Sequence, residues 1–386
     1  MKIAIVVHGR FHAFDLAAAL LRRGNDVTVF TNYPASVARK FGLPAENVRS
    51  FVLEGVLTRV VERAFSFAPT ISNSAFLHRL FGSWAARQLS TSSWDVIHCF
   101  SGIAEETLRM AVRDGVHHHL LRGSAHIATQ DRLLREEQER VGRALGRPTS
   151  WMITRELREY ELAERIIVLS TFARDSFLEE GVPEDKVRIV PLGVDTAHFQ
   201  APPEVFEARR LRVLRDEPLR IVYVGNASFQ KGFYDFAAIV RRLKGKMEFR
   251  VVGRVLPEVR RLFRGLEEAV EFVGHRPHLE LPKWYAQGDV FVFPTIQDGF
   301  AVVIPQAMAS GLPVMCTANC SGPDLIRDGI NGWVMPIRSP GEFIERLEWC
   351  DTHRAELAEI LENVRQGSYH VDWDTVAGEF ERESRW

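Results

Sequence analysis

Short runs of apolar, often β-branched residues alternate along the chain with stretches in which apolar residues recur every three or four positions. The first pattern predicts buried strands and the second predicts amphipathic helices. In residues 15–23, Asp15 is placed to cap a helix with an apolar stripe, and Gly24 to end it in the left-handed conformation. Strands that alternate with helices form parallel sheets. We therefore predict an α/β fold, with first-half strands at residues 3–7, 27–30, 96–100, 166–169 and 187–190.

The second half restarts with the pattern of the first. LRIVYVG at 219–225 resembles the opening MKIAIVVHG, and further strand runs follow at 249–253, 270–274, 290–293 and 313–316. We predict two Rossmann-like, doubly wound domains, residues 1–200 and 201–370, that face each other across a cleft. The join is expected near residues 200–217, which are charged, contain prolines and carry no strand pattern. A chain of 386 residues is long enough to bury two full cores.

The composition is that of an ordinary globular protein, with 46% hydrophobic and 26% charged residues. The 49 basic and 50 acidic residues leave a net charge of −1, without the basic surplus that phosphate backbones attract, so we expect no nucleic-acid partner. No run reaches the ~18 apolar residues of a membrane span. The opening apolar run breaks at His8, too early for a signal peptide. Four scattered cysteines suit a reducing compartment, and we expect a cytoplasmic protein.

Two features could suggest a metal site, and each has a simpler interpretation. Cys316 and Cys320 form a close pair without a second cluster, which favours two small buried residues. The run from His117 to His119 matches no metal-ligand spacing on a regular element, which favours a surface loop or a strand edge. We therefore expect no metal ion.

Ligands of parallel α/β sheets bind beyond the carboxyl ends of the strands, so we expect the chemistry in the cleft between the domains. Neither the GxGxxG dinucleotide fingerprint nor the GxxxxGK[ST] phosphate loop follows a strand, which argues against a dehydrogenase or a P-loop enzyme. The loop GNASFQKG, from Gly225 to Gly232, resembles the phosphate loop only loosely, but it places Lys231 where it could reach a phosphate. The alternative is an ordinary solvated lysine.

A second segment, residues 294–314, reads PTIQDGFAVVIPQAMASGLPV. It predicts a strand end, a turn at Asp298 and Gly299, and a helix that Gly311 stops. The start of such a helix would aim free amides and a positive dipole end at an anion. Asp298 and Gln306 lie eight positions apart and would share a face if both were on the helix. The alternative makes Asp298 an N-cap and Gln306 a surface residue.

The two segments resemble the signature of GT-B glycosyltransferases, particularly the large retaining group called family 4. That signature has a glutamate, Gly-Phe-Gly or similar, a second glutamate eight positions after the first, and Ala-Met-Ala-x-Gly-x-Pro-Val. Residues 225–232 are similar to the family's donor-phosphate loop, 272–276 to the stretch around the nucleobase, and 322–333 to the segment after the signature. Residues 122–126 resemble the loop whose histidine faces the transferred sugar. The resemblance therefore extends over most of the chain.

The resemblance implies a metal-independent hexosyltransferase without a cofactor. It would move a sugar, with retention, from a nucleotide-diphosphate-sugar donor to a glycan, lipid-linked or small-molecule acceptor. Residues 371–386 would form a helix that crosses back to the first domain. The implied catalytic residues are His126, Lys231 and Asp298. The implied donor-binding residues are Gly225, Asn226, Lys231, Gly232, Arg254, His275, Arg276, Gly299, Phe300, Ala301, Val302 and Gln306. On the acceptor side we expect Gly9, Arg10, His12 and Arg122, with an exposed loop as the alternative for Arg10 and His12.

Three departures from the family pattern bear on activity. Asp298 and Gln306 replace the two signature glutamates, and Asn226 stands where an arginine commonly follows the loop glycine. Glutamine can hydrogen-bond a ribose but carries no charge, and the missing arginine removes a cation for which Arg122 or Arg254 could substitute. The alternative function is a weak or inert relative that binds a nucleotide sugar or partners an active transferase. A GT-B epimerase or phosphorylase is a third possibility, although no lysine is marked for pyridoxal phosphate.

Residues 57–89 mix arginines with phenylalanines and a tryptophan. The commoner explanation of this pattern is core packing in which arginine stems cover apolar surface. The alternative is a peripheral contact with an anionic membrane or a site for a lipid-linked acceptor.

Overall fold

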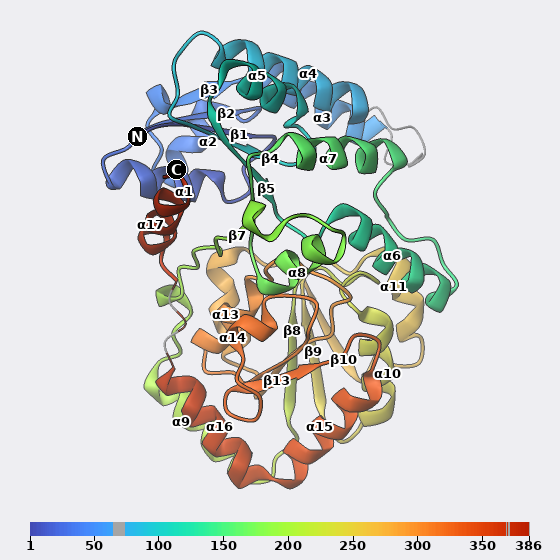
Figure 1. The fold of residues 1–386 in the computed structure, drawn as a ribbon. Helices are drawn as coiled ribbons and strands as arrows, with labels where there is room; N and C mark the ends of the chain where they lie inside the picture. The colour runs from blue at the N-terminus through green and yellow to red at the C-terminus, as the bar shows by residue number, and fades with distance from the viewer. Residues whose placement is uncertain (65–73, 368, 370, 386) are drawn as a thin grey trace.

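The computed structural model describes residues 1–64, 74–367, 369 and 371–385, which form two lobes, each built on one parallel sheet (Figure 1). The first sheet has the strand order β3-β2-β1-β4-β5-β6-β7. Alternate residues of its central strand enter different apolar clusters: Ile3, Ile5 and Val7 on one face, and Ala4 and Val6 on the other. Helices therefore cover both faces. The strands are β1 Lys2–Val7, β2 Asp26–Thr31, β3 Val48–Ser50, β4 Val96–Phe100, β5 His117–Arg122, β6 Arg165–Val168 and β7 Val187–Ile189.

The second sheet repeats the same plan with the order β10-β9-β8-β11-β12-β13. Its strands are β8 Arg220–Val224, β9 Glu248–Val252, β10 Val270–Gly274, β11 Val290–Phe293, β12 Val314–Thr317 and β13 Gly332–Met335. The strand order reverses beside β1 in the first sheet and beside β8 in the second. Such reversal points open a crevice at the carboxyl ends of the strands, where the loops diverge. The loops after β1, β4, β8 and β11 are therefore placed to form a site.

Helices connect successive strands in both lobes. The longer ones are α1 Ala13–Arg22, α3 Val52–Ala64, α4 Ser74–Leu89, α5 Glu105–Asp114, α6 Ile127–Val141, α7 Ser150–Leu162, α8 Thr171–Glu179, α9 Pro203–Leu214, α10 Phe233–Leu243, α13 Val303–Ala309, α15 Pro340–Thr352, α16 Arg354–Gln366 and α17 Trp373–Glu383. Four short ones are α2 Ala35–Ala38, α11 Pro257–Arg260, α12 Leu281–Tyr285 and α14 Gly322–Leu325. Among the helices that the structure describes, none combines the length and the apolar character needed to cross a membrane.

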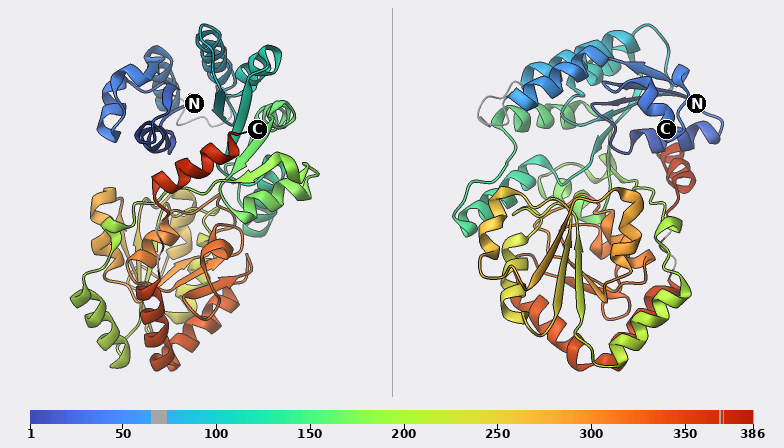
Figure 2. Two further views of the ribbon diagram at one scale, coloured as in Figure 1. Left: turned by 60° about the vertical axis from the view of Figure 1, so that its left-hand side comes forward. Right: turned by 180° about the vertical axis from the view of Figure 1, so that it is seen from behind.

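The last helix, α17, lies against α1 of the first lobe (Figure 2). Its apolar side, which includes Phe380, joins the core of the first sheet. Two exposed ion pairs flank this contact, Arg22 with Asp374 and Arg23 with Glu381, each at 2.9 Å. The chain therefore passes between the lobes twice, once after β7 and once before α17. The domain limits at residues 200 and 370 stay a prediction.

The predicted α/β fold with two parallel sheets is confirmed, and the ten strands predicted from apolar runs lie within one or two residues of the observed ones. Three short or polar strands, β3, β5 and β13, went unpredicted. The expectation of a loop or strand edge for residues 117–119 is wrong, because they open β5, which lies between β4 and β6. The helix predicted at 15–23 begins at Ala13, so Asp15 lies in its first turn and does not cap it.

Candidate active site

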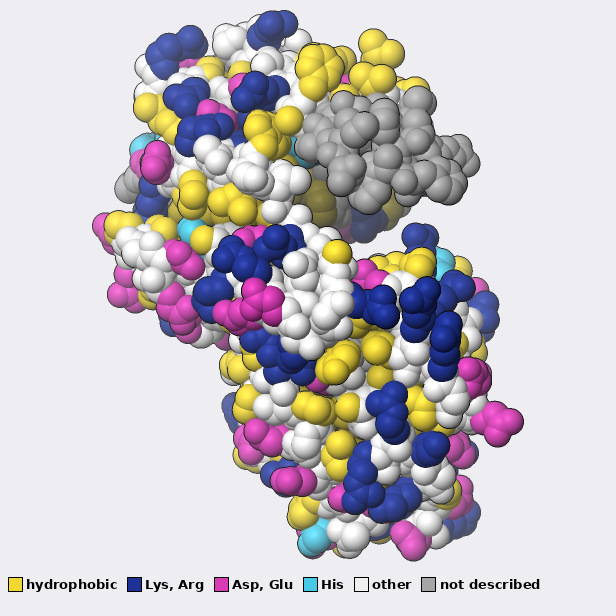
Figure 3. Space-filling view, turned by 90° about the vertical axis from the view of Figure 1, so that its right-hand side faces the viewer, with side chains coloured by type: hydrophobic (Ala, Val, Ile, Leu, Met, Phe, Trp, Pro, Cys, Tyr) yellow, Lys and Arg dark blue, Asp and Glu magenta, His cyan; other side chains and the backbone are white. Residues whose placement is uncertain are grey.

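A cavity of about 440 Å³ lies between the carboxyl ends of the two sheets. The first lobe contributes loops after β1, β4, β5, β6 and β7, and the second lobe contributes loops after β8 and β11. Figure 3 shows the molecule hollowed between the lobes, with Lys and Arg side chains gathered on the second lobe beside the hollow. We call the second-lobe lining the donor wall and the first-lobe lining the acceptor wall. The donor wall consists of Tyr223, Val224, Gly225, Lys231, Phe293, Asp298, Phe300, Ala301, Val302 and Val303, and the acceptor wall of Phe11, His12, Phe100, Ser101, Leu121, Arg122, Gly123, Ser124, Leu169 and Leu192.

Lys231 and Asp298 meet at the donor wall, with Nζ 2.5 Å from Oδ2. The two residues come from different loops, and a close backbone approach brings the loops together. Gly232 has a φ of +73°, and a Cβ on it would lie 1.7 Å from the carbonyl oxygen of Pro294. The amide of Ile296 donates to the Gln230 carbonyl at 2.9 Å. Only glycine fits this crossing, so the sequence itself dictates that Lys231 reaches the end of β11.

Asp298 lies in a loop, not on a helix. The helix α13 begins at Val303, and Ala301, with a φ of +61°, breaks the backbone path between the two. The predicted shared helix face of Asp298 and Gln306 is therefore wrong. The N-cap alternative fails as well, because Val302 occupies the N-cap position and no side chain caps the helix. The Asp298 carboxylate instead accepts from the Phe300 amide at 3.4 Å and pairs with Lys231.

Gln306 is buried on α13, which rules out the surface alternative. Its Oε1 accepts from the Tyr285 hydroxyl at 3.2 Å, and its Nε2 lies 3.4 Å from Nε2 of His278. It does not line the cavity. A contact between Gln306 and a ribose stays a prediction.

The remaining predicted donor residues divide into two groups. Gly225, Phe300, Ala301 and Val302 line the cavity. Asn226, Arg254, His275 and Arg276 are exposed and do not line it.

On the acceptor wall, His12 lines the cavity at the start of α1. Its ring lies 5.1 Å from the Phe100 ring and 6.1 Å from that of Trp373, measured between centroids. Burial lowers the pKa of His12 to about 4, so the imidazole is neutral at neutral pH, with one nitrogen donating and one accepting. Gly9 and Arg10 do not line the cavity but hold the loop after β1 in place. The Gly9 amide donates to Asn32 at 2.7 Å, and the Arg10 guanidinium lies over the Phe41 ring at 3.9 Å.

Arg122 lines the acceptor wall as a charge-balanced cation. Its Nε lies 3.1 Å from a Glu156 carboxylate oxygen, and its guanidinium donates to Gln130 at 2.6 Å. Of the two arginines expected to replace the missing loop arginine, Arg122 reaches the cavity and Arg254 does not. The two cations of the lining thus differ in their partners. Arg122 pairs with Glu156, which does not line the cavity, whereas Lys231 pairs with Asp298, which does.

His126 does not meet Lys231 and Asp298 in this structure. It occupies the N-cap of α6, where its Nδ1 accepts from the Ala128 amide at 3.3 Å. Its ring packs against Tyr160 and Phe177, each at 4.9 Å, and burial lowers its pKa to about 4. The histidine that does line the cavity is His12. The predicted catalytic role of His126 has no support from this placement.

Several contacts that the sequence did not predict hold the walls together. Gly299 passes so close to Gly123 that a Cβ on it would lie 2.1 Å from the Gly123 carbonyl oxygen. Ser124 donates to Gln297 at 2.7 Å across the same gap, and Ser170 donates to the Gly299 carbonyl at 2.7 Å. The only sequence signal for these contacts is their position directly after predicted strands.

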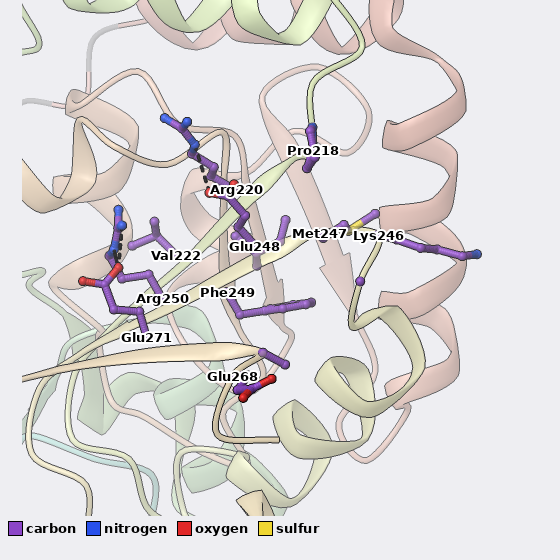
Figure 4. Close-up of a pocket in the computed structure, with 13 residues that line it drawn as sticks. Pro218, Arg220, Val222, Lys246, Met247, Glu248, Phe249, Arg250, Glu268 and Glu271 are labelled. Carbon is purple, nitrogen blue, oxygen red and sulfur yellow. Dashed lines mark hydrogen bonds and ion pairs between the residues drawn. The ribbon is translucent and has the colours of Figure 1, made fainter. Parts of the chain in front are cut away.

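A second hollow, of about 360 Å³, lies at the amino ends of β8, β9 and β10 (Figure 4). Four of its charged side chains pair with each other: Arg220 with Glu248 at 3.2 Å, and Arg250 with Glu271 at 2.5 Å. Because parallel sheets bind ligands at the opposite ends of their strands, this hollow is the weaker candidate. No group of three or more His, Cys, Asp or Glu side chains within the described residues is arranged to hold a metal ion.

Comparison with known proteins gives two family matches. Residues 10–198 match the model described as Glycosyltransferase Family 4, and residues 218–351 match Glycosyl transferases group 1. A putative colanic acid biosynthesis glycosyltransferase, WcaL of Escherichia coli K12, is 27% identical over 205 residues, 49% of this chain and 48% of that protein. A GDP-mannose-dependent alpha-mannosyltransferase of Mycobacterium tuberculosis is 32% identical over 195 residues, 50% of this chain and 49% of that protein. The chain thus spans about half the length of these curated relatives.

Solved structures share the whole fold. The crystal structure of Anabaena HepE in complex with UDP superposes with a TM-score of 0.71 at 15% identity, covering 99% of both chains. Sucrose-phosphate synthase of Thermosynechococcus elongatus superposes with a TM-score of 0.71 at 18% identity, covering 99% of this chain and 98% of that one. At these identities the likeness concerns the fold alone.

Proposed function

This chain belongs to the GT-B glycosyltransferases of group 1 and family 4, and we propose that it transfers a hexosyl group from a nucleotide-diphosphate sugar to a glycan, lipid-linked or small-molecule acceptor. The observation that carries the proposal is the Lys231–Asp298 pair, which lies at the carboxyl ends of β8 and β11 and faces the acceptor wall across one cavity. The relatives named above support a nucleotide-sugar donor, since one is described as GDP-mannose-dependent and one structure holds UDP.

The proposed role of Lys231 follows from the charge that the reaction creates. When a sugar–phosphate bond opens, negative charge grows on the departing diphosphate, and a fixed cation nearby stabilises it. The pairing with Asp298 holds the ammonium in the cavity before the donor arrives. We propose that the donor phosphate then shares this ammonium, while Asp298 binds hydroxyls of the transferred sugar. The amides from Gly299 to Val302 are proposed to bind phosphate or sugar oxygens.

We further propose that transfer retains the anomeric configuration and uses protein cations in place of a metal ion. In this scheme the acceptor attacks from the face that the phosphate leaves, and the phosphate takes the acceptor's proton. The bond from the anomeric carbon to the phosphate oxygen breaks as the bond to the acceptor oxygen forms. Proton NMR of the product anomer, with and without a chelator, tests both statements.

The alternative is a relative that binds a nucleotide sugar without turning it over. Two observations favour it: Asn226 is exposed outside the cavity, and Gln306 is buried beside Tyr285 with no charge to offer. Restoring the family pattern with Asp298→Glu and Gln306→Glu separates the two functions. Turnover that appears only in the double variant would establish the inert relative.

The test of the donor site is calorimetric titration with UDP, GDP, ADP and dTDP, without added metal, of the wild type and two matched lysine variants. Lys231→Ala removes the lysine of the cavity and leaves Arg122, which is paired with Glu156. Lys246→Ala removes a lysine that lines the hollow at the opposite ends of the strands. We expect one nucleotide to bind, Lys231→Ala to weaken it about 100-fold, and Lys246→Ala to leave it unchanged. Loss in Lys246→Ala alone would move the site to the other hollow, and no binding to the wild type would contradict the proposal.

The cellular setting is proposed from the relatives and from the surface. WcaL is described as a putative colanic acid biosynthesis glycosyltransferase, and AmsK of Erwinia amylovora, 26% identical over 186 residues, as an amylovoran biosynthesis glycosyltransferase, which supports polysaccharide assembly. We propose that the protein is cytoplasmic and contacts the inner face of the membrane. Helix α3 exposes Val52, Leu53, Val56 and Leu57, and Phe76 on α4 is also exposed. Phe81 is buried, so core packing accounts for part of this stretch, and residues 65–73 lie outside the described residues. Sedimentation of wild type and Leu53→Glu with anionic vesicles tests the membrane contact.

A further inference from the structure

Phe11 is an apolar side chain whose position the apolar core does not explain. It is 67% exposed, yet it lines the cavity directly after β1. Its ring stacks on that of Phe100, with centroids 5.9 Å apart and planes inclined by 26°. The two rings therefore form an aromatic platform in the cavity lining, and much of the Phe11 ring is open to a ligand. A single exposed phenylalanine is common on protein surfaces, but one that lines a cavity and stacks on a second ring is placed to contact a ligand.

The backbone at Phe11 is strained in a way that supports this account. Its φ is +40°, a conformation that side chains with a Cβ rarely adopt. The Phe11 carbonyl accepts from Nε of Arg10 at 3.2 Å, and the Arg10 guanidinium is itself held over Phe41. These contacts thus hold a bulky residue in a backbone conformation that glycine would adopt with less strain. A strained backbone conformation that is kept although glycine would relieve the strain is typical of binding and catalytic sites.

The rest of the acceptor wall indicates the kind of ligand. The neutral imidazole of His12 and the side chains of Ser101 and Ser124 supply uncharged donors and acceptors around the rings, and the charge of Arg122 on this wall is balanced by Glu156. A pyranose ring has one face rich in C–H groups and a rim of hydroxyls, so it matches an open aromatic face surrounded by uncharged polar groups. A lipid tail would leave those polar groups unpaired, which costs free energy. The opposite wall holds Lys231 and Asp298, where the transferred group would lie.

We infer that the acceptor is a sugar and that its pyranose ring stacks on Phe11. This inference rests on the proposed function and names its acceptor subsite. A sugar seated there would present a hydroxyl to the donor wall while the Phe11–Phe100 platform fixes the ring plane. Phe11 is therefore a positioning residue for the acceptor and takes no part in holding the nucleotide.

The test uses saturation-transfer NMR, which does not depend on turnover. The ligands are the methyl α-pyranosides of D-glucose, D-galactose and D-mannose, measured with and without UDP. We expect at least one to receive saturation on the ring protons of one face, from protein aromatic protons, whether or not UDP is present. Octyl β-D-glucopyranoside checks the lipid alternative. Saturation confined to its octyl chain, absence of ring saturation for every methyl glycoside, or complete displacement by UDP would overturn the inference.

Two controls make the result specific to Phe11. Phe11→Ala should weaken binding of the glycoside about fivefold, whereas Phe11→Trp should retain it. Phe76→Ala removes a phenylalanine that is 65% exposed but lies outside the cavity, and it should change nothing. Equal saturation in Phe11→Ala and wild type would overturn the inference. UDP titration of Phe11→Ala separates this failure from failure of the proposed function, because nucleotide binding should match that of the wild type.

The strain provides a second, independent readout. Phe11→Gly and Phe11→Ala both lack the ring and should lose the glycoside signal to the same extent. Phe11→Gly should nevertheless unfold at a temperature about 2 °C higher than Phe11→Ala, since only glycine adopts a positive φ without strain. Equal unfolding temperatures would contradict the account of Phe11 as a residue that the fold holds under strain.

Discussion

The donor wall of the cleft presents a paired ammonium and carboxylate, whereas the acceptor wall presents an aromatic platform and a neutral imidazole. Both walls follow from the same topology, since each is made of loops at the carboxyl ends of a parallel sheet. The difference lies only in the residues that those loops carry. In the function proposed here, the donor wall would hold an anionic leaving group and the acceptor wall an uncharged sugar.

The largest effect is expected where the two walls touch. Gly299→Ala would place a Cβ 2.1 Å from the Gly123 carbonyl oxygen, so the walls must move apart. Misplacement by about 1 Å can cost about 100-fold in rate, and we expect a loss of that order in consumption of the nucleotide sugar that binds. Small-angle scattering should show a larger radius of gyration.

The control for this variant is Gly341→Ala, where a Cβ would meet nothing within 4 Å. It should leave rate and radius unchanged. A Gly299→Ala protein with wild-type rate would show that contact between the walls does not matter.

The second effect concerns the acceptor wall and is a loss of stability at low pH. The pKa of His12 is lowered from 6.5 to about 4 in the folded protein by burial, so the unfolded chain binds this proton first. Stability is therefore full above pH 6.5 and is lost as the pH falls from 6.5 toward 4, by as much as ~1.4 kcal/mol per pH unit for one proton. His12→Gln should reduce the proton uptake on unfolding at pH 5 by about one. Urea unfolding at pH 5 and pH 7 measures the change, and an identical pH dependence in both proteins would contradict a neutral His12.

The third effect concerns the donor wall. Asp298→Asn removes the carboxylate that neutralises Lys231, which should tighten nucleotide binding about fivefold, as expected for a partly exposed pair worth ~1 kcal/mol. Turnover should fall, because the sugar loses its carboxylate. Titration of the nucleotide and a rate assay on the same preparation check both directions. Weaker nucleotide binding in Asp298→Asn would mean that Asp298 itself contacts the nucleotide.

The smallest effect concerns the backbone strain at Phe11. Between Phe11→Gly and Phe11→Ala we expect a difference in unfolding free energy of ~1 kcal/mol in favour of glycine. Denaturant titration of the two variants gives the value. A more stable alanine variant would indicate that the loop relaxes to a negative φ once the ring is gone.

Much of the fold could be predicted from the sequence because most strands are buried on both faces and read as unbroken β-branched runs. The exceptions have physical causes. β5 begins with three histidines, and two of them are buried, a state that residue type does not reveal. β3 reads VRS and β13 reads GWVM, and each contains only one β-branched apolar residue, so neither stands out as an apolar run.

The site was predicted in part for a similar reason. Lys231 and Asp298 lie in loops that follow apolar strands, and Gly232 lets the backbones of the two loops approach closely, so their meeting follows from their positions in the sequence. His126 lies on a predicted loop too, but α6 begins at the next residue and turns its ring back into the first lobe. Phe11 could not be predicted, because neither a positive φ nor the direction of a side chain can be read from residue type.

The most direct test of the central claim is a crystal structure with the nucleoside diphosphate that binds best in the titration. The account predicts the terminal phosphate within hydrogen-bond distance of Lys231 Nζ, on the donor wall, with the open face of Phe11 across the cavity. A nucleotide bound beside Lys246 in the hollow at the amino ends of the strands, or one in the cleft that does not touch Lys231, would contradict it.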